Sequence, residues 1–312
     1  MGQIRVGVVG LGAFGRHHAK HYAAHGGARL AALADVDIGR AEHAVAAYGG
    51  EAFADHRQLI GKVDAVSVAA PATHHARIAA DLIDAGIHVL VEKPLATDAV
   101  SARDLVGRAE RDGVVLQVGH IERYSPVVAE LRRRVVAPLR ITAVRRAVWS
   151  ERASDVDVVL DMMIHDIDHA LAFAGAPVAT VSASGAVRRS ASTDEAEAWL
   201  TFANGVIATL SASRVAARQE RRLTIGEAGG VFAADLARDA LAISARSGPG
   251  LAEMITPPRR DCLAAEIAAF IEAVRNGGRP EADGGAGLAA VEVAEWIRAA
   301  IDEPAAPVRA LV

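Results

Sequence analysis

The first 120 residues alternate between short apolar runs and longer segments in which apolar residues recur every three or four positions. The runs predict strands at residues 4–9, 30–34, 51–55, 64–70, 88–91 and 114–118. The segments between them predict helices at residues 14–24, 38–48, 74–85 and 98–111. Because strands and helices alternate strictly, we expect an α/β domain whose parallel sheet has helices on both faces.

The pattern changes after about residue 121. Helical periodicity is found at residues 126–136, 159–174, 263–276 and 288–301. Strand-like runs cover residues 139–149, 178–187, 195–202, 206–214, 221–225, 230–234 and 240–245. Strands that follow one another with little helix between them predict an open, largely antiparallel or mixed sheet with helices on one face. At 312 residues the chain is long for one core, so we expect one domain at residues 1–120 and a second α/β domain at residues 121–312.

A glycine-rich turn follows the first predicted strand. Gly10 allows a tight turn, Gly12 lets the backbone approach a pyrophosphate, and Gly15 lets the next helix pack closely on the strand. We expect the N–H groups of Ala13 and Phe14, at the start of that helix, to face the same anion. This spacing, between a strand and a helix, predicts a Rossmann domain that binds a dinucleotide.

Asp35 ends the second predicted strand, twenty positions after Gly15. The dinucleotide fingerprint has a carboxylate at this position, which accepts hydrogen bonds from the ribose hydroxyls. The same negative charge repels a 2′-phosphate, so we expect NAD rather than NADP as the cofactor.

Further residues with useful chemistry lie at the ends of predicted strands. In a parallel sheet, the residues that contact a ligand gather at the carboxyl ends of the strands. We therefore expect the cofactor to contact Ala70, Pro71, His74, Glu92 and Lys93. We expect the substrate to contact His120 at the end of the last strand.

Composition narrows the class of protein. The formal net charge of -4 gives no electrostatic reason to expect nucleic acid as a partner. The single cysteine, Cys262, excludes an internal disulfide framework and fits a reducing compartment. No apolar run approaches the length of a membrane span, and Met1 leads directly into a strand. We expect a cytoplasmic protein with no membrane partner.

Lys93 is one of only three lysines in a chain that otherwise uses arginine for its basic residues. A lysine in such a chain indicates a need for an ammonium, because lysine can release a proton and arginine cannot. Lys20 and Lys62 occupy positions typical of surface charges, whereas Lys93 stands between Glu92 and Pro94 at a strand end. There it can hydrogen-bond a substrate oxygen and stabilise or transfer its proton during hydride transfer. The alternative is a surface lysine that pairs with Glu92.

The predicted helix at residues 159–174 carries the densest polar cluster. Asp161, His165 and His169 are four residues apart and share one face, whereas Asp166 and Asp168 point elsewhere. Asp161 can orient the His165 imidazole and raise its pKa, which suits a general base that takes a proton from an alcohol. One alternative is a helical zinc site with the His165 and His169 spacing, for which no third ligand is identified. The other is a pair of histidines satisfied by neighbouring carboxylates.

Four arginines and a tyrosine lie near the start of the second predicted domain. Some of them are candidates for binding an anionic substrate such as a nucleotide diphosphate. The group consists of Arg123, Tyr124, Arg145, Arg146 and Arg152. A solvated surface role is the alternative for each.

With the glycine turn, Glu92-Lys93-Pro94 and Asp161-x-x-x-His165 in this order, the chain resembles the Gfo/Idh/MocA family of NAD(P)-dependent sugar and polyol oxidoreductases. The resemblance covers nearly the whole chain and includes residues 266–277. It implies a Rossmann domain followed by an α/β domain whose open sheet often forms oligomers, so a homodimer or homotetramer is expected. By position, it also implies that Lys93, Asp161 and His165 are catalytic and that Asp35 selects NAD.

Residues 118–126 and 155–168 carry a narrower likeness, to the members of this family that are UDP-N-acetylglucosamine 3-dehydrogenases. That likeness implies a nucleotide sugar as substrate. His165 would remove the proton of a secondary hydroxyl while Lys93 polarises the same oxygen. The alternatives are a free polyol or cyclitol dehydrogenase, a non-catalytic dinucleotide sensor and a metal-dependent hydrolase. The catalytic set disfavours a sensor, which would not need it.

Overall fold

The computed structural model describes residues 2–150, 155–245, 253–303 and 308–309. The chain divides into two compact units. The first consists of Met1–Ile121 and Asp261–Leu288, and the second of Glu122–Arg260 and Ala289–Val312.

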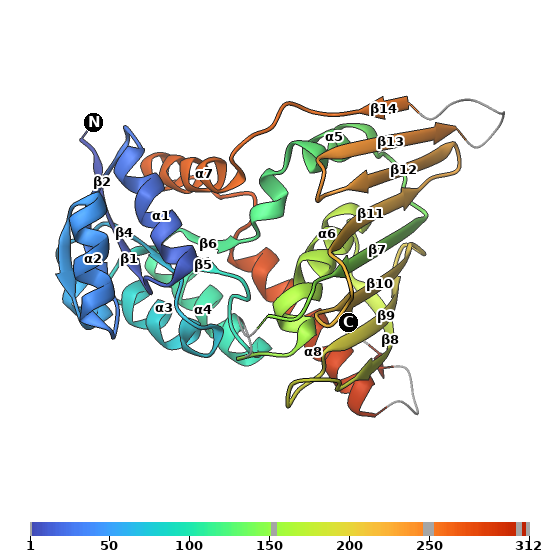
Figure 1. Cartoon of the computed structure of the whole chain (residues 1–312), viewed down its shortest axis with the longest axis horizontal. Helices are drawn as coiled ribbons and strands as arrows, with labels where there is room; N and C mark the ends of the chain where they lie inside the picture. Colours follow the sequence, from blue (N-terminus) through green and yellow to red (C-terminus); the bar gives the residue numbers. More distant parts are fainter. Residues whose placement is uncertain (1, 151–154, 246–252, 304–307, 310–312) are drawn as a thin grey trace. The chain divides into compact units, whose positions relative to one another are not determined.

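Over the described residues, the first unit contains a six-stranded parallel sheet in the order β3-β2-β1-β4-β5-β6 (Figure 1). Its strands are β1 (Ile4–Val9), β2 (Ala28–Ala34), β3 (Glu51–Phe53), β4 (Ala65–Val68), β5 (His88–Glu92) and β6 (Leu116–Gly119). All of β4 and β6 and most of β1 and β5 are buried, as in a parallel sheet with helices on both faces. The predicted Rossmann sheet is confirmed.

Three helices of this unit begin at an aspartate that caps them, and two of these end at a left-handed glycine. The helices of the unit are α1 (Ala13–Ala24), α2 (Ile38–Tyr48), α3 (His75–Ile83), α4 (Ala99–Asp112), α7 (Cys262–Asn276) and the start of α8 (Gly284–Asp302), with the 3-10 turns η1 (His56–Leu59) and η2 (Ala72–His74). Asp37, Asp98 and Asp261 cap α2, α4 and α7 by accepting hydrogen bonds from backbone N–H groups. Gly113 and Gly277 end α4 and α7 in the left-handed conformation.

Helix α7 belongs to the first unit because its apolar side chains complete the core there. Ile267 and Phe270 are buried in the same cluster as Tyr22 of α1 and Leu33 of β2. The division at residue 120 that the sequence suggests assigns α7 to the second domain. Its apolar periodicity identifies a helix but does not identify the sheet on which that helix packs.

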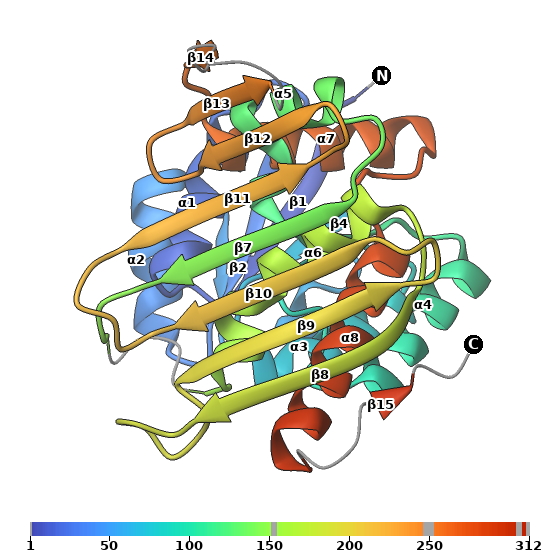
Figure 2. The ribbon, with the colours of Figure 1, turned by 90° about the vertical axis from the view of Figure 1, so that its right-hand side faces the viewer.

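The second unit is built on a mixed sheet with nine strands in the described part of the chain, in the order β14-β13-β12-β11-β7-β10-β9-β8-β15 (Figure 2). They are β7 (Arg140–Arg146), β8 (Val178–Ala186), β9 (Glu195–Phe202), β10 (Ile207–Ser213), β11 (Glu220–Gly226), β12 (Gly230–Asp235), β13 (Ala240–Ala245), β14 (Glu253–Ile255) and β15 (Val308–Arg309). Strands β7 and β10 are parallel, and the other neighbours are antiparallel. This confirms the predicted open mixed sheet.

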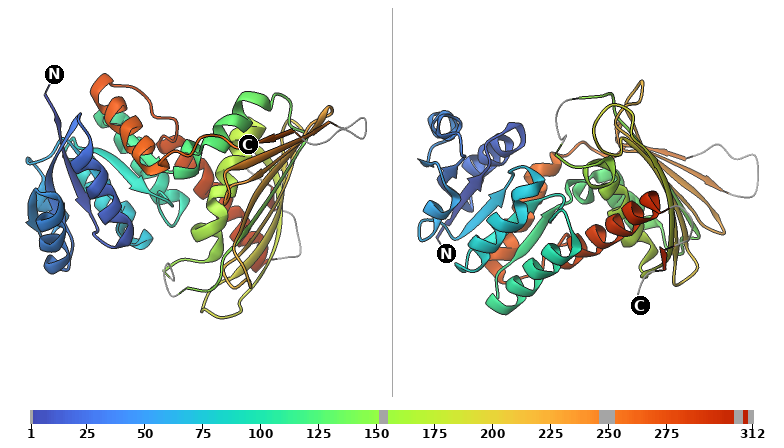
Figure 3. Two further views of the ribbon diagram at one scale, coloured as in Figure 1. Left: turned by 45° about the horizontal axis from the view of Figure 1, so that its top comes forward. Right: turned by 90° about the horizontal axis from the view of Figure 1, so that it is seen from below.

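Residues of β7 and β9 alternate between buried and more exposed positions, so one face of this sheet is covered. The helices lie on that face (Figure 3). The helical elements are η3 (Ile121–Tyr124), α5 (Pro126–Arg134), η4 (Val159–Met163), α6 (Ile164–Ala174) and the rest of α8. Of the helices that the structure describes in either unit, none is both long and apolar enough to cross a membrane.

We expect Phe270→Ala to lower the free energy of unfolding of the first unit by about 3–5 kcal/mol, because it removes a fully buried ring from the core. Val100→Ala is the control, because Val100 on α4 is 74% exposed and its loss should change stability by less than about 0.5 kcal/mol. Urea denaturation measures both. Equal effects of the two substitutions would show that α7 contributes no core packing.

Candidate functional site

The glycine turn of the first unit has room for a ligand on one side and none on the other. Gly10 has φ of +84°, and a Cβ placed there would lie 2.6 Å from the Ala70 nitrogen. Gly12 precedes α1 without a side-chain cap, and a Cβ on it would meet nothing within 4 Å. The first turn of α1, which includes Ala13 and Phe14, therefore presents backbone N–H groups beside open space. This geometry fits the pyrophosphate of a dinucleotide.

Asp35 lies directly beside this turn, at the end of β2. Its Oδ2 accepts a hydrogen bond from the Leu11 N–H at 2.6 Å, and its Oδ1 accepts one from the Asp37 N–H at 2.9 Å. The residue is only 6% exposed. Its carboxylate is therefore fixed next to the glycine turn, where it fits a ribose. That it selects NAD remains a prediction.

Strand β5 ends at Glu92, and Lys93 follows, joined to Pro94 by a cis peptide bond. Glu92 is buried, whereas Lys93 is partly exposed. Gly119 on β6 leaves room for the Glu92 carboxylate because it lacks a side chain. A Cβ at this position would lie 2.7 Å from both carboxylate oxygens. The Glu92 side chain is thus packed closely against Gly119.

A second buried acid, Glu266 of α7, lies near Glu92. Neither carboxylate oxygen of Glu266 has a hydrogen-bond partner among the described residues. Burial, followed by the negative charge of Glu92, raises the pKa of Glu266 well above its ordinary value. Burial of Glu266 therefore favours its neutral form. The sequence places this residue in a helix but gives no sign that it faces another carboxylate.

In the second unit, Asp161 lies in a π-helical turn, η4, and His165 lies in the first turn of α6. The sequence predicts one continuous α-helix here, so the π turn corrects that expectation. Such turns are frequent at functional sites. Asp161 and His165 are partly exposed, whereas His169 is buried. The predicted stripe of three residues therefore runs from partly exposed to buried positions.

Arginines bind the carboxylates that surround His169. Arg145 of β7 contacts Glu122 at 2.6 and 2.7 Å and Asp166 at 2.9 and 3.0 Å. His169 Nε2 lies 3.2 Å from Glu122 Oε2. Burial opposes ionisation of Glu122, but Arg145 and His169 outweigh it and hold its pKa well below the ordinary value. The Nε2 atom of His169 is thus paired with a neighbouring carboxylate.

Pairing with buried carboxylates also involves two arginines of the predicted anion-binding cluster. Arg123 binds Asp168 at 2.5 and 2.8 Å, so Arg123 and Arg145 are both neutralised within their own unit. Arg146 has a side chain 47% exposed, and Arg221 one 43% exposed. Sequence reasoning missed Arg221, which the strand register places opposite Arg145. The pattern of apolar residues within one strand does not show its register with a strand far away in the sequence.

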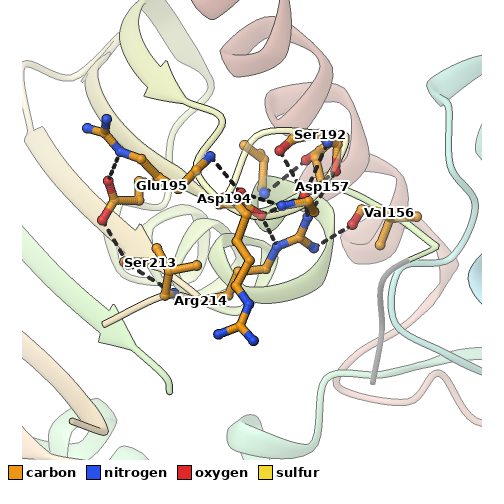
Figure 4. Close-up of polar contacts among 12 residues, drawn as sticks. Val156, Asp157, Ser192, Asp194, Glu195, Ser213 and Arg214 are labelled. Atoms are coloured by element: carbon orange, nitrogen blue, oxygen red, sulfur yellow. Dashed lines mark hydrogen bonds and ion pairs between the residues drawn. The ribbon is translucent and has the colours of Figure 1, made fainter. Parts of the chain in front are cut away.

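A buried pair fastens the segment that enters the π turn (Figure 4). Asp194 accepts hydrogen bonds from the N–H groups of residues 188–190 at 2.6 to 3.0 Å and from Arg214 Nε at 2.8 Å. Arg214 Nη1 also donates to the Val156 carbonyl at 2.8 Å. Asp157 accepts hydrogen bonds from the first N–H groups of η4 at 2.9 and 3.2 Å. These bonds fix the backbone directly before Asp161.

The remaining predicted residues are distributed between the two units. His120 is buried after β6, and His74 is exposed at the end of η2. Pro71 precedes η2, Tyr124 ends η3, and Arg152 lies outside the described residues. The predicted cofactor residues all belong to the first unit, whereas Asp161 and His165 belong to the second. In the described ranges, no group of three or more histidine, cysteine or acidic side chains could hold a metal ion.

Two family models match the chain. Residues 4–120 match the GFO/IDH/MocA oxidoreductase family, NAD-binding Rossmann fold, and residues 127–232 match the GFO/IDH/MocA C-terminal domain. Over 307 residues the chain is 36% identical to UDP-N-acetylglucosamine 3-dehydrogenase of Acidithiobacillus ferrooxidans, covering 96% of this chain and 97% of that protein. Over 301 residues it is 27% identical to scyllo-inositol 2-dehydrogenase (NAD(+)) of Bacillus subtilis, covering 89% and 88%.

Solved structures agree with these matches. The Acidithiobacillus ferrooxidans enzyme superposes with a TM-score of 0.91 at 36% identity, covering 97% of this chain and 99% of that one. A levoglucosan dehydrogenase in complex with NADH and levoglucosan gives a TM-score of 0.91 at 19% identity, covering 99% of each chain. At that identity the second likeness is one of fold.

We expect Asp35→Ser to raise the Kd for NAD about tenfold or more, because a charge-assisted hydrogen bond contributes about 1.5–3 kcal/mol. Its preference for NAD over NADP should also shrink, since the carboxylate no longer repels a 2′-phosphate. Asp104→Ser on the exposed surface of α4 is the matched control. Calorimetric titration with both dinucleotides measures the change, and an unaltered NAD to NADP ratio would contradict the role of Asp35.

We expect Glu266→Gln to become more stabilising as pH rises. Because burial raises the folded-state pKa above the ordinary value of 4.5, the wild-type chain loses up to about 1.4 kcal/mol of stability per pH unit between that value and the folded-state pKa. The neutral amide does not titrate, so the advantage of the variant is smallest near pH 4.5 and grows toward pH 7. Glu272→Gln, on the exposed side of α7, is the control. Urea denaturation across this pH range should show no such slope if Glu266 is solvated.

Proposed function

Because the chain belongs to the GFO/IDH/MocA oxidoreductase family, and so is an enzyme that uses NAD to oxidise CH–OH groups, we propose that it oxidises a sugar secondary hydroxyl to a ketone. The specific substrate we propose is a UDP-N-acetylhexosamine, oxidised at C3. The observation that carries this choice is the 36% identity over 96% of the chain to UDP-N-acetylglucosamine 3-dehydrogenase. The first unit binds the cofactor, and the second binds the substrate.

The proposed mechanism assigns one task to each polar group. His165, oriented by Asp161, removes the proton of the hydroxyl, and the partial exposure of both side chains leaves them accessible to a substrate. Lys93 hydrogen-bonds the same oxygen and stabilises the charge that develops on it. NAD, held by the glycine turn and Asp35, accepts the hydride from the ring carbon. The alcohol thus loses a proton and a hydride and becomes a ketone.

The diphosphate of a nucleotide sugar requires unneutralised cations. Arg221 suits this task better than Arg123 and Arg145, because the latter two are engaged with buried carboxylates. Arg146 points to the opposite face of the sheet from Arg145 and α6, whereas Arg221 shares the face of Arg145. The contact between Arg221 and Glu122 is long, at 3.9 Å, so a phosphate can replace it at little cost. A homodimer or homotetramer and a cytoplasmic location remain predictions.

The alternative substrate is a free cyclitol, because scyllo-inositol 2-dehydrogenase is 27% identical to the chain over most of its length. A cyclitol carries no phosphate, so it gives Arg221 no role. Activity on UDP-N-acetylglucosamine and on free inositol therefore separates the two possibilities.

We expect NADH to form with NAD and UDP-N-acetylglucosamine, but not with inositol or glucose. Lys93→Met and His165→Ala should each slow hydride transfer by about 10²-fold or more, because each removes a group that handles the proton. Lys62→Met replaces an exposed lysine of the first unit and should leave the rate unchanged. Single-turnover absorbance at 340 nm measures the chemical step even if NADH release is slow. Turnover of inositol alone would favour the cyclitol, and a wild-type rate in Lys93→Met would remove Lys93 from the mechanism.

A further inference from the structure

His75 is a buried ring between two backbone carbonyl groups. It is the first residue of α3 and only 1% exposed. Its Nδ1 lies 2.7 Å from the Pro94 oxygen, and its Nε2 lies 2.8 Å from the Ala70 oxygen. A carbonyl oxygen only accepts, so both contacts are hydrogen bonds when both ring nitrogens carry a proton. His75 thereby joins the backbone after β4 to the backbone after β5.

His18 is a second buried ring, on α1. Its Nε2 lies 3.0 Å from Glu92 Oε1, and its Nδ1 lies 3.1 Å from the Ser67 Oγ. The Ser67 Oγ is in turn 2.7 Å from the Tyr22 hydroxyl. One direction of donation satisfies every group: Tyr22 donates to Ser67, Ser67 to His18 Nδ1, and His18 Nε2–H to the Glu92 carboxylate. The chain of hydrogen bonds ends on the residue before Lys93.

The two rings therefore hold the two residues on either side of Lys93, namely Glu92 through its side chain and Pro94 through its backbone oxygen. We propose that His18 and His75 are positioning residues that hold Lys93 in its reactive place and, through Ala70, couple that place to the cofactor-binding turn. This inference rests on the proposed role of Lys93. Neither ring touches substrate. They act on the rate through the position of the Lys93 ammonium.

The three lysines of the chain allow a test that needs neither substrate nor cofactor. Competitive acetylation of the free protein, quantified by mass spectrometry, gives the reactivity of the Lys93 amine relative to the exposed Lys62. We expect His18→Gln and His75→Gln each to change this ratio about threefold or more, as half a pKa unit changes the free amine by that factor. His56→Gln is the matched control, because His56 is also buried and bonded to Asp81 at 2.8 Å, in η1. Unchanged Lys93 labelling in both variants would overturn the proposal.

A double-mutant cycle tests the consequence for the reaction, by single-turnover hydride transfer with NAD and UDP-N-acetylglucosamine. We expect His75→Gln and His18→Gln to slow the step by about 10- to 100-fold in the wild-type background, as displacement of a positioned group does. In the Lys93→Met background they should add no more than about twofold, because their effect passes through Lys93. If each histidine substitution slows hydride transfer in the Lys93→Met background as much as in the wild type, the proposal is overturned.

The labelling experiment and the kinetic experiment test different hypotheses, so one hypothesis can be rejected while the other stands. If Lys93→Met reacts as fast as the wild type, the proposed function of Lys93 is wrong, while the labelling still decides whether the two histidines hold it. Cooperative thermal unfolding of every variant excludes global misfolding. Where a glutamine variant does not fold, His18→Asn or His75→Asn replaces it in both experiments.

Discussion

A carboxylate buried at the end of β5 is the constraint on which the candidate site of the first unit depends. A carboxyl group away from water needs a hydrogen-bond donor and space for its oxygens, and a second charge of the same sign beside it is costly. His18 on α1 is the donor, Gly119 on β6 leaves the space, and Glu266 on α7 is the neighbour whose own pKa is raised. One acidic residue next to Lys93 thus sets requirements for three other elements. Helix α7 meets its requirement from a position some 170 residues further along the chain.

The second unit also contains buried acidic residues, and there arginines pair with them. The α6 segment carries four ionisable residues in five positions, and a buried cluster of this kind is unstable unless each charge is paired. Arg145 and Arg123 pair with Asp166 and Asp168, and Glu122 accepts from Arg145 and faces His169. These pairings leave His165, with Asp161 in the π turn before it, on the partly exposed side of the segment. Structural and reactive roles are thereby separated along a single helix.

The sequence predicts those features of the fold and site that depend on residues close together in the chain. Strand and helix periodicity identifies the two sheets, and the glycine spacing, Asp35 and Lys93 are recognisable from their immediate neighbours. The parts that the sequence misses depend on contacts between distant segments. Whether α7 packs in the first or second unit, whether His74 or His75 faces inward, and which arginines are neutralised follow from register and tertiary packing. The π turn at Asp161 likewise has no periodic signature in five residues.

The pairing of charges also bears on substrate choice. Relatives of this chain include dehydrogenases named for a nucleotide sugar and for inositols, so a proton-removing set alone does not distinguish the two substrates. A buried arginine already neutralised by carboxylates attracts a phosphate weakly, because its field is cancelled nearby. The charge that discriminates between a diphosphate and a neutral ring must then lie on a side chain such as Arg221, which is 43% exposed, shares the sheet face of Arg145 and has a long contact to Glu122. Substrate preference in such a site can change at this position without a change in the buried ion pairs around His169 and α6.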